Sequence, residues 1–154
     1  MNDISIRDFE MEGEELFYSM ASEFHGSDAV VYGKINHEAL QTTFDACINK
    51  SPFVSGFFIY KNNEVCGYAL MCFTYSNEYG GKIMIIDEIY VKEEFRGKGL
   101  ASFFVKEIIS KYKHDVVYVE VEVKKDNTEA INLYKKFEFG INDYQLMYKF
   151  FNRS

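Results

Sequence analysis

The chain has 154 residues, of which 47% are hydrophobic and 27% charged. This balance indicates one globular domain over residues 1–154 and excludes disordered and collagen-like chains. The 17 Lys and Arg against 24 Asp and Glu give a formal net charge of −7. An acidic chain without a basic tract is poorly suited to bind nucleic acid or an anionic membrane, and it suits cationic partners better.

The first half of the chain predicts a strand, two helices and a meander of three strands, in that order. Hydrophobic residues alternate over residues 4–9, as in a strand, and recur at helical spacing over 11–24 and 36–48. Asn36 is a suitable N-cap for the second helix. A hairpin and one further turn then separate three strands, expected at residues 53–60, 65–75 and 82–91.

The second half of the chain alternates helices and strands. We expect a helix, a strand, a helix and a final strand at residues 99–112, 115–123, 127–137 and 144–151. Together the elements predict a mixed α/β (α+β) fold with helices on both faces of a central mixed sheet of about six to seven strands. In this sheet an antiparallel meander is followed by a βαβ crossover.

The three cysteines and three histidines form no pattern typical of a metal site or a disulfide framework. No C-x-x-C pair occurs, and no two histidines lie at helical spacing. We therefore expect a cytoplasmic protein with reduced thiols and no bound metal. No secretory signal is visible at the N-terminus, and the apolar runs are too short to cross a bilayer.

A glycine-rich loop, E-F-R-G-K-G-L-A at residues 94–101, lies between a predicted strand and a predicted helix. The free N–H groups and the dipole of the helix N-terminus favour an anion, and Arg96 and Lys98 add positive charge. Two phosphate motifs are excluded. The dinucleotide fingerprint needs glycine in place of Ser102, and the P-loop needs Ser or Thr directly after Lys98. The remaining pattern is R-x-x-G-x-A.

A second motif follows the next predicted strand. Residues 127–139 read N-x-x-A-x-x-L-Y-x-K-x-E-F. The two motifs, in this order and at this spacing, resemble those of the GNAT acetyltransferase superfamily. The superfamily usually has glycine at the position of Glu138. The resemblance covers residues 65–139. Within it, residues 67–101 are most similar to the diamine or polyamine acetyltransferase branch.

The resemblance implies a site for acetyl-CoA as cosubstrate. In the family, a strand pairs with the pantetheine arm through its backbone, the glycine-rich loop holds the pyrophosphate, an asparagine hydrogen-bonds the arm, and a tyrosine protonates the departing thiolate. The residues at the matching positions are Ile89, Tyr90, Val91, Arg96, Gly97, Lys98, Gly99, Leu100, Ala101, Ser102, Asn127 and Tyr134.

The resemblance also suggests a general acid and a general base. Tyr134 is the expected acid, because a phenol with a pKa of about 10 can protonate a thiolate whose acid has a pKa of about 8.5. Asp87 aligns with the strand carboxylate used as base in the polyamine branch, and Glu122 matches a carboxylate position of ribosomal-protein acetyltransferases. Glu88 should face the other side of an alternating strand, unless the strand bulges there.

The acceptor is less well defined by the sequence. Acceptor-contacting residues of the family lie after the first helix, where this chain has Glu23, His25 and Asp28. The acidic balance favours a small cationic amine such as a polyamine or diamine. Two alternatives stay open: a protein N-terminus or lysine as acceptor, and a regulatory module that binds acyl-CoA without catalysis. By analogy with the family we expect a homodimer, supported by the aromatic strand at residues 144–151.

Overall fold

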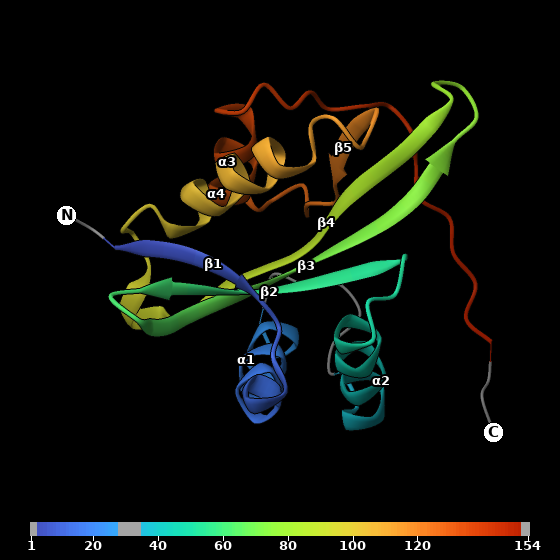
Figure 1. The fold of residues 1–154 in the computed structure, drawn as a ribbon. Coiled ribbons are helices and arrows are strands. Elements are labelled where there is room, and N and C mark those ends of the chain that lie inside the picture. Colours follow the sequence, from blue (N-terminus) through green and yellow to red (C-terminus); the bar gives the residue numbers. More distant parts are fainter. Residues whose placement is uncertain (1–2, 28–34, 152–154) are drawn as a thin grey trace.

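A computed structural model of the chain describes residues 3–27 and 35–151 and shows a central sheet between two layers of helices (Figure 1). The strands occur in the spatial order β1-β2-β3-β4-β5. Neighbouring strands pair antiparallel from β1 to β4, whereas β4 and β5 pair parallel. The strand bounds are β1 (Ile4–Asp8), β2 (Val54–Lys61), β3 (Glu64–Ser76), β4 (Gly81–Val91) and β5 (Tyr118–Val121). This confirms the predicted meander and crossover.

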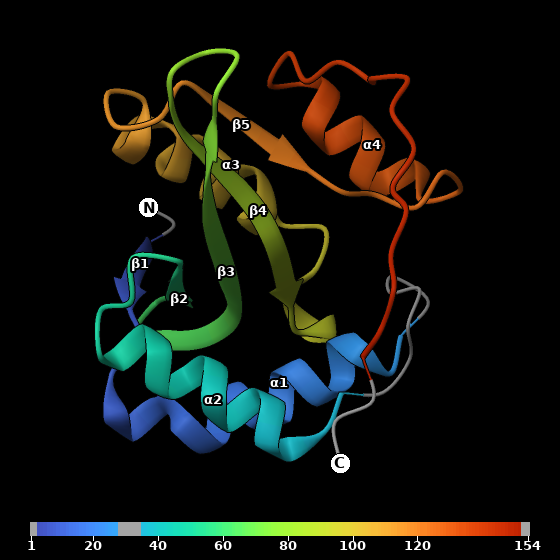
Figure 2. The same cartoon turned by 90° about the vertical axis from the view of Figure 1, so that its right-hand side faces the viewer.

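In the described residues, two α-helices cover each face of the sheet (Figures 1 and 2). On one face lie α1 (Glu14–His25) and α2 (His37–Ile48), and on the other lie α3 (Leu100–Tyr112) and α4 (Thr128–Lys135). As expected, Asn36 caps α2, its side chain accepting a hydrogen bond from the Ala39 N–H at 2.7 Å. None of the helices in the described ranges has both the length and the apolarity to cross a membrane.

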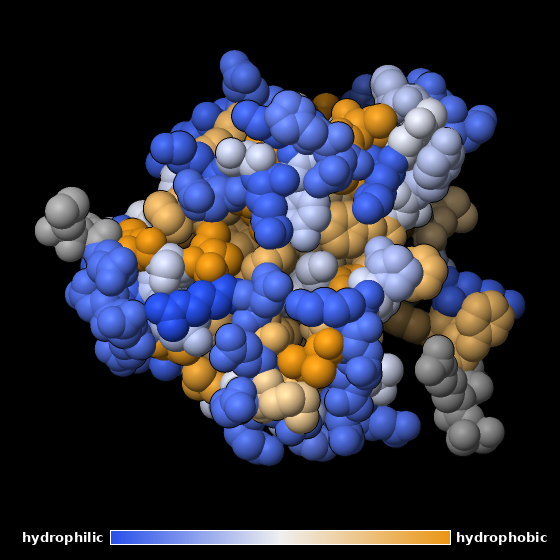
Figure 3. All heavy atoms as spheres, viewed as in Figure 1, coloured by the Kyte–Doolittle hydropathy of each residue, from blue (hydrophilic) through white to orange (hydrophobic). Residues whose placement is uncertain are grey.

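The sheet separates two hydrophobic cores. Phe17 and Phe44 are fully buried between the sheet and the α1/α2 layer, where Phe9 stacks within 5.4 Å of the Phe44 ring. Phe104 of α3 is fully buried on the opposite side. Because strand side chains alternate between faces, one meander supplies apolar residues to both cores. Hydrophilic atoms dominate the surface seen in Figure 3, and hydrophobic atoms show in the hollow between α3 and β1.

The end of the chain differs from the prediction. Residues 140–151 form no strand, so the sheet has five strands in the described residues and not the expected six to seven. The segment runs along the outside of the molecule from α4 toward α1 (Figure 2). Alternating hydrophobicity makes a strand only where an edge satisfies the backbone hydrogen bonds, and this segment pairs with none in the described residues. It exposes Ile141, Tyr144, Leu146, Met147, Tyr148, Phe150 and Phe151.

Candidate active site

The two parallel strands β4 and β5 separate about halfway along β4. Their pairing begins at Ile83 and Tyr118 and ends at Ile86 and Val121. Beyond that point β4 continues to Val91, still paired with β3 on its other edge. Every second N–H and C=O of β4 after Ile86 therefore points toward the opening, without a partner in the described strands. Such an edge can pair with an extended, amide-containing ligand.

A β-bulge lies where the two strands part. Met71 of β3 pairs with Ile86, but its neighbour Leu70 pairs with Glu88, so Asp87 is an extra residue in β4. The bulge resets the alternation of side chains. Ile86 and Ile89 both pack toward α3, whereas Glu88 is drawn into the buried α1 side of the sheet, where its side chain is 8% exposed. The strand thus bulges at Asp87, which is the exception to strict alternation that we named for Asp87 and Glu88.

The glycine-rich loop follows β4 and leads into α3. Gly97 and Gly99 have φ values of 72° and 78°, in the left-handed region that favours glycine. A Cβ added at either glycine would have no protein atom within 4 Å, so the chain leaves open space beside this backbone. Arg96 ties the loop to the end of β4, since its Nε donates a hydrogen bond to the Val91 carbonyl at 2.9 Å.

The N-terminus of α3 offers donors to an anion. Gly99 is its N-cap and has no side chain to cap the helix. The first hydrogen bond of the helix backbone runs from the Phe103 N–H to the Gly99 carbonyl at 2.9 Å. The N–H groups of Leu100, Ala101 and Ser102 are therefore left to a ligand or to solvent. This cradle fits a pyrophosphate by its donors and by the space beside both glycines.

The second motif places Asn127 and Tyr134 at the two ends of α4. The Asn127 side chain caps the helix by accepting a hydrogen bond from the Ala130 N–H at 3.1 Å, which leaves its amide NH2 group as a donor. Tyr134 packs in the core that contains Leu100 and Ile86, and its residue is 8% exposed. Burial raises the pKa of Tyr134 to about 12, so the phenol keeps its proton at neutral pH. It can serve as a proton donor.

Two carboxylates flank the point at which β4 and β5 part. Asp87 and Glu122 directly follow Ile86 and Val121, the last paired residues of the two strands. Burial of the site, then the charges of Glu88 and Glu122, raise the pKa of Asp87 to about 6, and His25 opposes the shift. Its side chain still reaches solvent. A carboxylate with such a pKa is suited to accept a proton near neutral pH.

A polar cluster connects α1 to the bulge. The His25 Nε2 lies 2.5 Å from Glu88 Oε1, and the Tyr68 hydroxyl donates a hydrogen bond to the same oxygen at 3.2 Å. Beside them the Tyr90 hydroxyl donates a hydrogen bond to Glu23. The structure thus brings Glu23 and His25 to the strand that carries Asp87. The third predicted acceptor residue, Asp28, lies outside the described residues.

Sequence reasoning missed Glu88, Tyr68 and the Tyr90 hydroxyl as parts of this cluster. For Glu88, the sequence does contain an indication. Two consecutive carboxylates interrupt the apolar run of β4, and a strict alternation would put one of them into the α3 core. The partnership with His25 spans 63 residues and left no local signal. In the described residues, no three His, Cys, Asp or Glu side chains lie close enough together to hold a metal ion.

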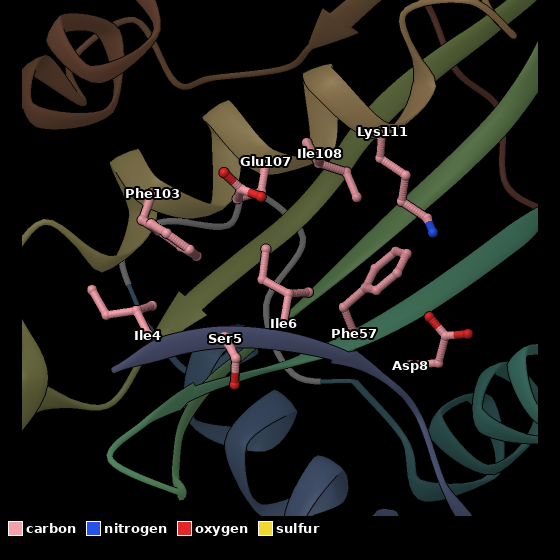
Figure 4. Close-up of a pocket in the computed structure, with 9 residues that line it drawn as sticks. All are labelled: Ile4, Ser5, Ile6, Asp8, Phe57, Phe103, Glu107, Ile108 and Lys111. Atoms are coloured by element: carbon pink, nitrogen blue, oxygen red, sulfur yellow. The ribbon is translucent and has the colours of Figure 1, made fainter. Parts of the chain in front are cut away.

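A separate groove of about 360 Å³ lies between β1 and α3 (Figure 4). Ile6 and Phe57 point into it from the sheet, and Phe103 and Ile108 from the helix. None of the residues of the loop, the strand opening or the polar cluster lines it. The groove is therefore distinct from the site described above.

Comparison with known proteins gives a family match over most of the chain. Residues 14–139 match the sequence model of the acetyltransferase (GNAT) family. This range contains the strand opening, the glycine-rich loop and the second motif. No protein of curated function matches the chain.

Solved structures share the fold but little sequence. A possible acetyltransferase from Clostridium difficile 630 aligns with a TM-score of 0.82 and 18% identity, over 98% of this chain and 99% of that chain. The aminoglycoside N-acetyltransferase AAC(6')-Iy, in complex with a bisubstrate analogue containing CoA, aligns with a TM-score of 0.75 and 13% identity, over 97% of this chain and 99% of that chain. Ribosomal-protein-alanine N-acetyltransferase from Brucella melitensis biovar Abortus 2308 aligns with a TM-score of 0.76 and 13% identity, over 96% of this chain and 99% of that chain.

Proposed function

Because this chain belongs to the GNAT acetyltransferase family, it is an acyltransferase that uses acetyl-CoA, and we propose that its acceptor is the primary amine of a small cation such as a diamine or polyamine. One observation carries the choice of acceptor. The point where β4 and β5 part is flanked by Asp87 and Glu122, with Glu88 and Glu23 on the neighbouring α1 side. The negative charge of these carboxylates attracts an ammonium ion to this part of the molecule.

The cosubstrate supplies an acetyl group activated as a thioester. In our proposal the backbone of Ile89, Tyr90 and Val91 pairs with its pantetheine arm along the free edge of β4. The N–H groups of residues 97–102 hold its pyrophosphate, and Arg96 and Lys98 lie beside the phosphates. The Asn127 amide donates to the arm. The open edge, the two glycines with positive φ and the uncapped helix N-terminus support this placement.

The side chains at the opening then manage the protons. Asp87 accepts a proton from the acceptor nitrogen as the new amide forms, with Glu122 beside it as the alternative base. Tyr134 gives its phenolic proton to the sulfur that leaves. The amine attacks directly, so no covalent enzyme intermediate is needed. The raised pKa values of Asp87, about 6, and Tyr134, about 12, support these roles of base and acid.

The proposal is tested by measuring free-thiol release from acetyl-CoA with a panel of acceptors. The panel holds polyamines, short diamines, lysine analogues, aminoglycosides and peptides with a free N-terminus. We expect release with diamines and polyamines and at most slow release with neutral amines or peptides. Release with peptides alone would contradict the small-cation acceptor. Saturable acetyl-CoA binding without release from any amine would favour a regulatory module.

We also propose that the protein is a homodimer in the cytoplasm. The exposed apolar side chains of residues 140–151 support a contact with a second copy, since a run of large apolar residues is costly to leave in water. The three cysteines are free thiols, two of them buried, which suits a reducing compartment. Light scattering over a range of protein concentrations tests the dimer. A monomer mass at every concentration would contradict it.

A further inference from the structure

The acetylation of an ammonium ion requires two proton acceptors. The nitrogen of R–NH3+ loses one proton before it can attack and a second as the amide forms. At pH 7 an amine with a pKa of about 10.4 is deprotonated in only about one molecule in a few thousand. Asp87 accounts for the second proton in the function proposed above, on which this inference rests. The first proton needs an acceptor that faces the incoming cation.

His25 is held in one orientation by a buried carboxylate. The carboxylate of Glu88 can only accept hydrogen bonds, so the contact of 2.5 Å between Glu88 Oε1 and His25 Nε2 places a proton on Nε2. The Tyr68 hydroxyl fixes the same carboxylate oxygen from β3. In neutral His25 the other ring nitrogen, Nδ1, is then the one that carries a free lone pair.

The free nitrogen of His25 is reachable from outside. Nδ1 has no hydrogen-bond partner in residues 3–27 and 35–151, and no buried side-chain nitrogen or oxygen there lacks a partner. Nδ1 is therefore exposed, in agreement with the 20% exposure of the side chain. The same reasoning applies to Oε2 of Glu88, a carboxylate oxygen without a partner in a side chain that is only 8% exposed.

The groups around His25 favour a bound cation. From α1 comes Glu23, which accepts from the Tyr90 hydroxyl, and from β4 come Glu88 and Asp87. His25 is close enough to Asp87 to act on its charge. The Phe24 ring stands edge-on to the imidazole at 5.1 Å and adds no charge. These carboxylates favour an ammonium ion in the region that holds both Asp87 and the imidazole.

We propose that His25 is the first proton acceptor for the amine and that Glu88 is its positioning residue. The N–H bond of R–NH3+ breaks, its electron pair stays on the nitrogen, and the proton forms a bond to Nδ1. The products are R–NH2 and an imidazolium whose charge faces the Glu88 carboxylate. The imidazolium returns its proton to solvent through the exposed Nδ1, and Asp87 remains free for the second proton. The substrate class is therefore an aliphatic amine that arrives protonated.

The kinetic test compares His25→Gln with the wild type on the best amine of the panel. Glutamine keeps an N–H donor for Glu88 but has no lone pair that titrates. We expect kcat/KM to fall about 100-fold at pH 7. The deficit should shrink at least tenfold by pH 9, because free amine becomes tenfold more abundant with each pH unit. His114→Gln, an exposed position at the end of α3, is the matched control and should behave as the wild type.

A second measurement does not depend on activity. In 15N NMR spectra of the wild type, His25 should carry its proton on Nε2 at high pH, and Glu88→Gln should weaken that preference. With three histidines, His25→Gln assigns the signal. A proton on Nδ1 would overturn the inference even if no amine were acetylated. Active wild type with an unchanged pH profile in His25→Gln would also overturn it, and would leave the proposed function standing. Inactive wild type would count against the proposed function only.

Discussion

Replacing Gly99 by valine should separate cosubstrate binding from folding. Gly99 has a φ of 78° at the N-cap of α3, and a Cβ there would have no protein atom within 4 Å. The variant therefore meets no clash inside the protein. Its cost in the free enzyme is the left-handed backbone alone, about 1–2 kcal/mol. For a chain of this size that lowers Tm by about 2–8 °C.

The cost for the bound state should be larger. The new side chain would occupy the space that we assign to the pyrophosphate, so at least two hydrogen bonds from the loop to a charged group would be lost. Each is worth about 1.5–3 kcal/mol. A loss of about 3–6 kcal/mol raises Kd by about 100-fold to 20,000-fold, since 1.4 kcal/mol corresponds to a factor of ten.

Gly80→Val is the matched control. Gly80 also has a positive φ, 65°, and open space at its Cβ, but it lies in the turn before β4, at the other end of that strand from the loop. Both variants should lose similar stability in thermal unfolding. Only Gly99→Val should lose acetyl-CoA affinity in calorimetric titration. Equal affinities of the two variants for acetyl-CoA would show that the pyrophosphate does not bind at this loop.

Three further variants test the remaining roles. Tyr134→Phe should lower kcat by about 100-fold or more while acetyl-CoA affinity is kept; unchanged turnover would exclude Tyr134 as the acid. Asn127→Asp keeps an oxygen to cap α4 but removes the amide donor, so Kd for acetyl-CoA should rise while Tm stays within a few degrees; an unchanged Kd would contradict the contact with the arm. Asp87→Asn should lose the rise of kcat through about pH 6, and a profile identical to the wild type would move the base to Glu122 or water.

The raised pKa of Asp87 also has a consequence for stability. The folded state binds this proton more tightly than the unfolded state, whose aspartate has a pKa of 3.8. Asp87 therefore favours folding at low pH, and that contribution is lost as pH rises from about 4 through about 6. Asp87→Asn should consequently gain in Tm relative to the wild type over the same range. A variant that loses stability relative to the wild type as pH rises would contradict the raised pKa.

Local patterns were sufficient to predict most of the fold. Helical spacing in α2 and α3, and the turns that bound the apolar strands β3 and β4, are properties of short segments, and the structure has these elements within about two residues of their expected bounds. The predicted strand at residues 144–151 is wrong, because an apolar segment does not reveal whether a sheet edge is available to pair with it. β5 covers only Tyr118–Val121, so the strand expected at residues 115–123 is shorter than predicted.

The site divides in the same way. The glycine-rich loop is recognisable because its backbone geometry is encoded by adjacent residues, and Gly97 and Gly99 indeed have the positive φ that only glycine adopts easily. The bulge at Asp87 depends on how β3 and β4 align, which is decided by packing along both strands. Without the bulge Glu88 cannot reach α1, and so the contact with His25 could not be predicted from residues 63 positions apart.

The two proton transfers that we propose both depend on the bulge in β4. A regular strand would place Asp87 and Glu88 on opposite faces, one of them in the α3 core, at a cost of several kcal/mol for an unpaired buried carboxylate. The extra residue instead leaves Asp87 at the strand opening and turns Glu88 toward His25. In our proposal, these two side chains are the proton acceptors for one incoming amine. The pairing of β4 with β5 also ends at this bulge, and the backbone edge left free there is the one that we propose for the cosubstrate.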